Sequence, residues 1–459
     1  MTAPVTNLPV PTSSTDLPPV ERRAVIPAGF KAGGMAVGIK ASGRPDLAVV
    51  VTTAGPAAAA AVFTPNAFAA APVRLSRANL AATSGDPRGG YGWANSLIST
   101  SGSANAATGP DGDADQLEVA AMLAAATVTE PEWTQHMSTG IIGTRLPLEK
   151  VRSGLAALVP MLSPTDDGLL AVATALCTTD SRTKTATTTV ELPAADGRAV
   201  TVRVSGVAKG VGMIHPQMAT MLSVILTDAT VAPEVLWPLL RPAAARTWNQ
   251  LSVDGDTSTN DTVLVLASGV AGAAPAEGDT PSAVALGRAI EAIARDLARQ
   301  QAADGEGANT LITAAVTGAR DDAEARAVAR AVISSSLVKA AAHGRDPNWG
   351  RVAGAAGNAR LAIASVLEAA GLPADEAAAR AGTPVTLDPA KLRIWIAGHL
   401  VYDGGRGGPV GFDRAAARAA MNEAEVVISL DLGLGGGSGE GFGCDLTEAY
   451  VIENSEYTT

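Results

Sequence analysis

One stretch of the chain combines residue types that could perform covalent chemistry. Residues 209–229 read KGVGMIHPQMATMLSVILTDA, in which Lys209 begins a glycine-punctuated loop. Thr220 ends that loop, directly before a short apolar, β-branched run that predicts a buried strand. If the peptide bond between Ala219 and Thr220 were cleaved, Thr220 would gain a free α-amine beside its hydroxyl. Such an amine, with a pKa of about 7.7–8.0, can take the hydroxyl proton and make Thr220 a nucleophile.

Three other segments place polar groups beside glycine or at the chain end. They are STG at residues 138–140, DGEG at residues 304–307 and NSEYTT at residues 454–459. Each segment alone has an ordinary explanation, namely a turn, a helix end and a frayed terminus. By the same reasoning, Lys209 could be a solvated loop lysine and Thr220 a strand threonine. The residue types alone therefore support both a shared site and unrelated surface features.

The elements that would position these segments follow from hydrophobic periodicity and turn residues. Helix 281–303 is the clearest, because Thr280 can cap it and Pro281 suits its first turn. ADG at residues 195–197, between two alternating runs, predicts a hairpin. Strand clusters with intervening helices, but without regular βαβ alternation, predict an α+β fold of mixed sheets with flanking helices. Further strands are predicted within 47–51, 57–63, 258–267, 311–316 and 426–432, and further helices over 113–126, 148–157, 168–177, 233–248 and 323–342.

The overall composition argues against some classes of partner. The chain has 459 residues, of which 47% are apolar, and a formal net charge of -11. It is long enough for a large core, but nucleic-acid binding is not expected, because neutralising phosphates requires clustered Lys and Arg. Residues 47–73 carry no charge, yet turn residues interrupt them. Buried strands and turns are therefore predicted there, and no membrane span.

Cysteine usage and the N-terminus bear on the cellular compartment. Cys177 and Cys444 are the only cysteines in the sequence, and neither has a partner at zinc-ligand spacing. This pattern predicts neither a disulfide framework nor a metal site, and it suits a reducing cytoplasm. Residues 1–25 are rich in Pro, Ser and Thr and lack a signal-peptide pattern, so they predict a disordered lead-in.

Taken together, these segments resemble the ornithine acetyltransferase family, also called bifunctional glutamate N-acetyltransferases. The resemblance extends over nearly the whole chain. It implies a DmpA-like fold of two intimately associated lobes and autocatalytic cleavage between Ala219 and Thr220. The products would be an α chain, residues 26–219 after the lead-in, and a β chain, residues 220–459, assembled as α2β2. Besides residues 209–229, the resemblance rests on GIKASGRPDLAVVV (38–51), STGIIG (138–143), SVDGDTSTNDT (252–262), DGEGA (304–308), GRDPNWGR (344–351) and EYTT (456–459).

The resemblance also implies a role for each candidate site residue. Thr220 would be the nucleophile that forms an acetyl-enzyme, and Thr139 and Gly140 would form the oxyanion hole. These residue types suit the chemistry, because hydrogen-bond donors stabilise an oxyanion. Lys209 can bind a carboxylate group, and Glu306 can bind an amine group. Transfer through a covalent intermediate implies ping-pong kinetics, and no cofactor or metal is expected. The residues implied to bind the amino-acid substrate are Thr178, Thr179, Lys209, Thr220, Glu306, Asn454 and Thr459.

The implied activity is acetyl transfer from N²-acetyl-L-ornithine to L-glutamate in arginine biosynthesis, with amino-acid N-acetyltransferase activity as a second reaction to test. One alternative is a paralogous N-acyl amino acid acyltransferase or amidohydrolase, because Ser103, Ala107 and Phe442 depart from the usual family pattern. Another is a non-enzymatic binding module whose motifs are packing loops. Nucleotide binding by residues 433–443 is disfavoured, since their glycines do not follow G-x-G-x-x-G.

Overall fold

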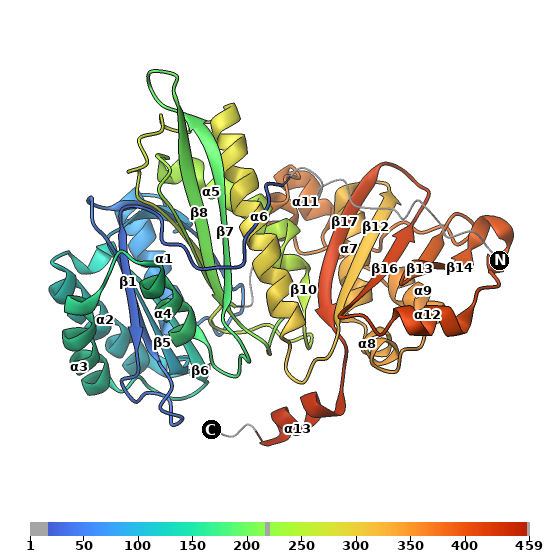
Figure 1. The fold of residues 1–459 in the computed structure, drawn as a ribbon, viewed down its shortest axis with the longest axis horizontal. Helices are drawn as coiled ribbons and strands as arrows, with labels where there is room; N and C mark the ends of the chain where they lie inside the picture. Colours follow the sequence, from blue (N-terminus) through green and yellow to red (C-terminus); the bar gives the residue numbers. More distant parts are fainter. Residues whose placement is uncertain (1–16, 216–220, 457–459) are drawn as a thin grey trace.

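The computed structural model describes residues 17–215 and 221–456. Ala219, Thr220 and Thr459 lie outside these ranges, as does most of the predicted lead-in. Three sheets and their flanking helices form two lobes that lie side by side (Figure 1). This arrangement confirms the predicted α+β fold with mixed sheets. In the two described ranges, no helix is long and apolar enough to cross a membrane.

The first sheet has the strand order β1-β2-β5-β6. β1, β2 and β5 pair antiparallel, whereas β5 and β6 run parallel. Two helices, α2 and α3, cover its outer face, and α1 and α4 cover its inner face. The strands are Phe30–Met35 (β1), Leu47–Thr52 (β2), Ser96–Ser103 (β5) and Thr134–Ile141 (β6). The helices are Ala71–Ser84 (α1), Gly109–Thr127 (α2), Leu148–Leu158 (α3) and Asp166–Leu176 (α4).

The second sheet has the order β4-β3-β11-β9-β8-β7 and packs on the other side of α1 and α4. The apolar run that follows Thr220 forms β9, and all residues of β9 are buried. The predicted hairpin is confirmed as β7 and β8, which pair antiparallel in one continuous register. The strands are Ala57–Phe63 (β3), Tyr91–Ala94 (β4), Lys184–Pro193 (β7), Ala199–Lys209 (β8), Leu222–Thr227 (β9) and Thr262–Ala267 (β11).

The helix α6 (Pro281–Ala303) lies between the second and third sheets, and α5 (Pro233–Arg246) packs beside it (Figure 1). α6 begins as predicted, because the Thr280 hydroxyl accepts a hydrogen bond from a backbone N–H of the first turn. Its apolar stripe, formed by Leu286, Ile290, Ile293 and Leu297, is buried against the second sheet. On another face of the helix, the Arg295 guanidinium donates a hydrogen bond to Glu440 Oε2 of the third sheet at 2.7 Å. α6 therefore joins the two lobes.

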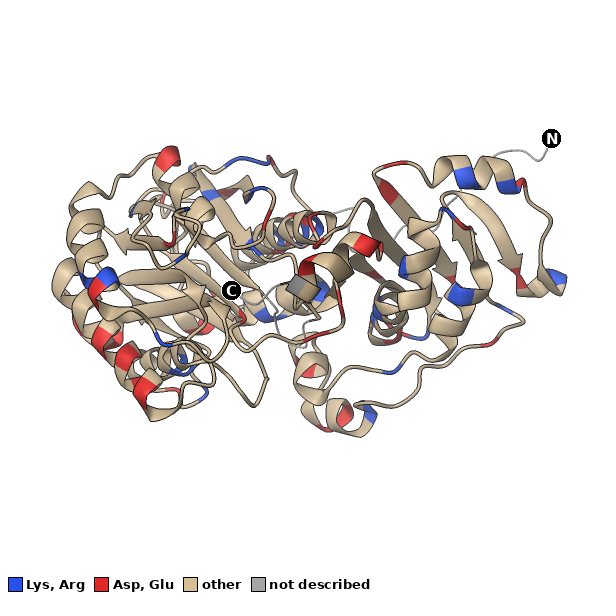
Figure 2. Ribbon diagram, turned by 90° about the horizontal axis from the view of Figure 1, so that it is seen from below, with Lys and Arg blue, Asp and Glu red and all other residues tan. Residues whose placement is uncertain are grey.

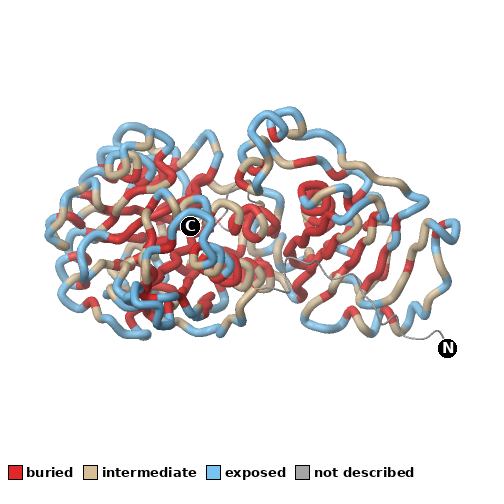
Figure 3. Tube along the Cα trace, turned by 90° about the horizontal axis from the view of Figure 1, so that it is seen from above, coloured by how far each residue is buried: buried red, intermediate tan, exposed pale blue. Residues whose placement is uncertain are grey.

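The third sheet makes up most of the second lobe, with the order β10-β17-β12-β16-β13-β14-β15. Buried residues follow its strands and the helices on its faces (Figure 3). The strands are Leu251–Ser252 (β10), Leu311–Ala319 (β12), Arg393–Ile396 (β13), His399–Asp403 (β14), Gly408–Pro409 (β15), Glu425–Asp431 (β16) and Gly437–Cys444 (β17). The helices are Asp322–Ser334 (α7), Ser336–His343 (α8), Trp349–Gly357 (α9), Ala364–Ala369 (α10), Ala374–Arg380 (α11), Arg414–Ala420 (α12) and Glu448–Glu456 (α13).

Two expectations for the second lobe differ from the structure. The single helix predicted over 323–342 is two helices, α7 and α8, because Ser335 leaves the helical conformation and caps α8 with its side chain. The glycine run 433–443 received no predicted element, yet most of it lies in the buried strand β17. A Cβ at Gly439 would lie 2.8 Å from the Arg326 backbone nitrogen, so glycine lets α7 pack directly on the strand. The other predicted elements are confirmed, with ends that differ by a few residues.

Candidate active site

A cavity of about 440 Å³ opens between the first lobe and the C-terminal helix. That helix, α13, leaves the third sheet and returns beneath the first lobe (Figures 1 and 2). Every predicted site residue within the described ranges lines this cavity. They are Thr139, Gly140, Thr178, Thr179, Lys209, Glu306 and Asn454. The fold thus brings together segments that are far apart in the sequence.

Thr139 and Gly140 lie at the end of β6, where the pairing with β5 becomes irregular. Gly140 has a φ of +128°, and a Cβ there would lie 2.4 Å from the carbonyl carbon of Gly102. Only glycine fits this backbone without a shift. Asn260 holds the same strand end, because its Nδ2 donates a hydrogen bond to the Ser138 carbonyl at 2.8 Å. This segment is therefore rigidly placed beside the cavity.

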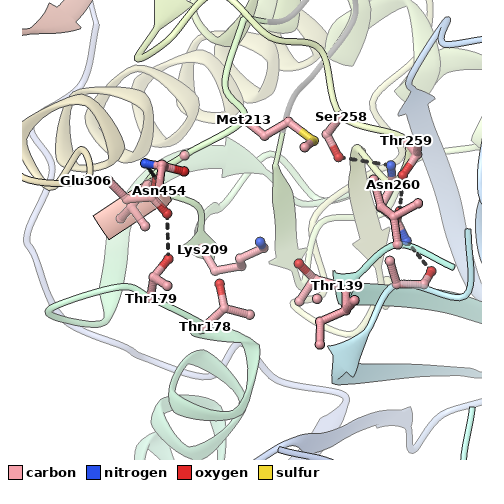
Figure 4. A pocket seen from close by; sticks show the side chains of 16 residues that line it. Thr139, Thr178, Thr179, Lys209, Met213, Ser258, Thr259, Asn260, Glu306 and Asn454 are labelled. Atoms are coloured by element: carbon pink, nitrogen blue, oxygen red, sulfur yellow. Dashed lines mark hydrogen bonds between the residues drawn. The ribbon is translucent and has the colours of Figure 1, made fainter. Parts of the chain in front are cut away.

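Lys209 ends β8, and its side chain extends into the cavity between Thr139 and Thr178 (Figure 4). Burial lowers the pKa of Lys209, and the carboxylates of Asp180 and Asp261 only partly oppose this effect. Within the part of the chain that the structure describes, the ammonium donates no hydrogen bond. Lys209 thus presents a desolvated amine, whose charged form a ligand carboxylate would stabilise.

Glu306 lies on the side of the cavity away from β6 and is held by two side chains (Figure 4). Its Oε1 accepts a hydrogen bond from Thr179 Oγ1 at 3.0 Å, and its Oε2 accepts one from Asn454 Nδ2 at 2.9 Å. The carboxylate lies against Gly212, where a Cβ would approach Oε2 to 2.2 Å. The Glu306 N–H also donates to the Val211 carbonyl at 2.8 Å. The cavity therefore offers a fixed carboxylate in addition to the Lys209 cation.

A buried ion cluster lies behind these residues. Lys184 is fully buried, and its Nζ lies 2.6 Å from Asp180 Oδ1 and 2.6 Å from Asp304 Oδ2. Burial alone would raise the pKa of Asp180, but the ammonium groups of Lys184 and Lys209 hold that pKa below its ordinary value. One cation thus joins two carboxylates that would otherwise repel each other.

The same cluster connects the loops that carry the cavity residues. Asp180 accepts hydrogen bonds from the backbone N–H groups of Thr178 and Gly210, both at 2.9 Å. Asp304 lies two residues before Glu306, and this short segment follows the end of α6. The ion cluster therefore ties together the backbone at residues 178–180, the end of β8 and the loop that presents Glu306.

The remaining predicted site residues, Thr220 and Thr459, lie outside the described ranges, as does Ala219. Met221, which follows Thr220 in sequence, is buried. It lines a small adjoining cavity together with Thr139 and Lys209. The roles of Thr220 as nucleophile and Thr459 as substrate ligand stay predictions.

Residues 258–260, which read STN, also line the main cavity, although no role was predicted for them. Asn260 Oδ1 accepts a hydrogen bond from Thr259 Oγ1 at 2.7 Å, and its Nδ2 donates to the Ala104 carbonyl at 2.7 Å. This polar run precedes the buried strand β11, as Thr220 precedes β9, and the two strands are parallel neighbours. Polar residues directly before a buried strand were the signal that could have identified them.

The chain is similar to known proteins over most of its length. Residues 31–459 match the model of the ArgJ family. The Arginine biosynthesis bifunctional protein ArgJ of Thermosynechococcus vestitus is 42% identical over 434 residues, which cover 94% of this chain and 96% of that protein. The protein of the same name from Thermus thermophilus is 41% identical over 434 residues, with coverages of 95% and 99%. A crystal structure of Arginine biosynthesis bifunctional protein argJ from Bacillus halodurans is 37% identical, with a TM-score of 0.45, over 52% of this chain and 100% of that chain.

Proposed function

The chain belongs to the ArgJ family, and from this premise we propose that it transfers an acetyl group from N²-acetyl-L-ornithine to L-glutamate. The observation that carries the proposal is the cavity itself. It contains the Lys209 ammonium and the Glu306 carboxylate, the latter held by Thr179 and Asn454. The donor N²-acetyl-L-ornithine carries the complementary pair of charges, because its α-carboxylate suits Lys209 and its side-chain ammonium suits Glu306.

In the proposed reaction, the α-amine of Thr220 takes the proton of its own hydroxyl while Oγ attacks the acetyl carbonyl of acetylornithine. Thr139 and Gly140 stabilise the negative charge that develops on the carbonyl oxygen. The C–N bond then breaks, and the proton passes from the α-amine to the departing ornithine nitrogen. Glutamate attacks the acetyl ester through its own amine, and Thr220 Oγ leaves and regains a proton. Donor and acceptor thus use one site in turn, which is a ping-pong mechanism.

The proposal includes self-cleavage between Ala219 and Thr220, which yields an α chain (residues 26–219, after the lead-in) and a β chain (residues 220–459). It also includes an α2β2 assembly of these two chains. The second sheet supports a stable association of these chains. β8, which precedes the proposed cut, pairs antiparallel with β9, which follows it. β3 likewise pairs with β11. The proposal also includes a cytoplasmic location, supported by the buried free thiols of Cys177 and Cys444.

Two measurements on the purified chain test this function. Incubation with acetylornithine and glutamate should yield acetylglutamate and ornithine, detected by mass spectrometry. Denaturing electrophoresis should show two fragments whose masses sum to 45.9 kDa. Absence of acetylglutamate would exclude the proposed acceptor or donor, and release of acetate without glutamate would indicate an amidohydrolase. A single intact band would refute self-processing.

Replacement of Lys209 by alanine should raise KM for acetylornithine by about 10- to 100-fold, because a hydrogen bond to a charged group contributes about 1.5–3 kcal/mol. The turnover number should change less, since the proposal assigns Lys209 to the substrate carboxylate and not to the acetyl group that reacts. Steady-state kinetics at several donor concentrations measure both constants. Lys31→Ala, at an exposed lysine of β1, is the matched control and should leave KM unchanged. An unchanged KM in Lys209→Ala would remove Lys209 from the carboxylate site.

A further inference from the structure

A second cavity, of about 380 Å³, lies between α7 and residues 358–370, and none of its described lining residues belongs to the candidate active site. One part of its wall comes from His215 and from Asn249 and Gln250, which belong to the first lobe. The opposite part comes from α7 and the segment around α10. This cavity therefore lies at the contact between the two lobes.

Positive charge is concentrated in this cavity. Three arginines, Arg326, Arg330 and Arg360, contribute to its wall, whereas none of its described lining residues is an aspartate or glutamate. This is unusual in a chain with 45 acidic and 34 basic residues. The nearest carboxylate oxygen to Arg326 belongs to Asp322, at the long distance of 3.9 Å. Arg360 is exposed, and its guanidinium donates a hydrogen bond to the Gly382 carbonyl at 3.1 Å.

Polar and apolar groups in the same wall restrict the chemistry of a ligand further. Gln250 is 4% exposed, and its Oε1 has no hydrogen-bond partner among the described residues. A buried acceptor of this kind destabilises the fold while it stays unpaired. The Ser334 Oγ is likewise buried without a partner in residues 17–215 and 221–456. Beside these groups the wall is apolar, with Leu361, Val366 and Leu367.

We propose that this cavity is a second binding site, which takes a small carboxylate with an N–H group and an aliphatic body, such as an N-acylated aliphatic amino acid. The arginine guanidinium groups suit the carboxylate, because their planar fork can donate two parallel hydrogen bonds. The amide N–H satisfies the buried Gln250 Oε1. The aliphatic body packs against Leu361, Val366 and Leu367, where burial of apolar surface adds affinity.

Isothermal titration of the full chain with N-acetyl-L-leucine tests the proposal. We expect the acid to bind at one site per chain, and N-acetyl-L-leucinamide, which lacks the carboxylate, to bind at least about tenfold more weakly. Equal affinity of the two probes, or no binding of the acid at millimolar concentration, would overturn the proposal.

Substitutions assign the bound probe to one of the two cavities. Arg360→Gln should weaken binding of the acid by about tenfold, and Gln250→Leu should do the same by removing the acceptor. Arg152→Gln, at an exposed arginine of α3, is the control and should bind the acid normally. Lys209→Met should also leave binding unchanged. If Lys209→Met abolishes binding and Arg360→Gln does not, the probe occupies the candidate active site and the proposal is wrong.

The test is independent of the proposed enzymatic function. Arg360→Gln should transfer acetyl groups at the wild-type rate with saturating substrates, because Arg360 lies outside the candidate active site. Because Arg360 is exposed, this variant tests the site even if the buried Gln250→Leu substitution impairs folding.

Discussion

Replacement of Thr220 by alanine should produce a single uncleaved chain of 45.9 kDa that transfers no acetyl group. Without the hydroxyl, neither self-cleavage nor formation of the acetyl-enzyme has a nucleophile. We expect kcat to fall on the order of 10⁴-fold or more, as when the nucleophile of a covalent mechanism is removed. Intact-mass measurement reports the cleavage, and acetylglutamate formation reports the transfer.

Thr220→Ser is the matched variant for this experiment, because it keeps a hydroxyl and would keep an α-amine after cleavage. It should be processed, and it should retain activity well above that of Thr220→Ala. Cleavage of Thr220→Ala at the same bond, identified by N-terminal sequencing of the fragment, would overturn the nucleophile assignment. Activity of the uncleaved variant would overturn the role of the free amine.

Lys184→Met should strongly destabilise the folded chain. The substitution leaves Asp180 and Asp304 buried without the ammonium that lies 2.6 Å from each of them. Removal of one partner from a buried ion pair typically costs about 3–5 kcal/mol of unfolding free energy. Chemical unfolding in a Thr220→Ala background measures the change on a single chain. Lys391→Met, at an exposed lysine, should change stability little.

The effect of Lys184→Met should depend on pH in a defined direction. In the unsubstituted protein the pKa of Asp180 is lowered, so its contribution to stability is present at neutral pH and is lost as the pH falls through the folded-state pKa. Without Lys184, the protonated forms of the buried carboxylates are favoured. The loss of unfolding free energy caused by the substitution should therefore shrink as the pH falls from 7 to 4. A loss below about 1 kcal/mol at pH 7, typical of an exposed ion pair, would show that the cluster is not structurally important.

Local features of the fold could be predicted from the sequence because their signals are local. The β7–β8 hairpin follows from alternation around a turn, and α6 follows from its cap and its apolar stripe. The strand β9 follows from the buried run after Thr220. The break at Ser335 was missed, because apolar periodicity continues through it while the capping hydrogen bond decides the backbone.

The connections within the candidate site could not be predicted in the same way. Asp304 appeared to be only a helix end, yet its main partner, Lys184, lies 120 residues away in the sequence. The hydrogen bond from Asn454 to Glu306 spans 148 residues. Such contacts depend on how sheets and helices pack, and periodicity carries no information about them. Family resemblance named the site residues, but it did not indicate the ion cluster that holds them.

The pairing of β8 with β9 has a consequence for the order of events in the cell. Lys209 lies opposite Leu222 in this ladder, so the two flanks of the proposed cut are adjacent only after the second sheet has assembled. A chain that misfolds cannot place Thr220 beside the groups that would promote cleavage. The catalytic amine would then exist only in molecules that have already folded. Self-cleavage would thereby act as an internal quality control, which prevents misfolded copies from gaining acetyltransferase activity.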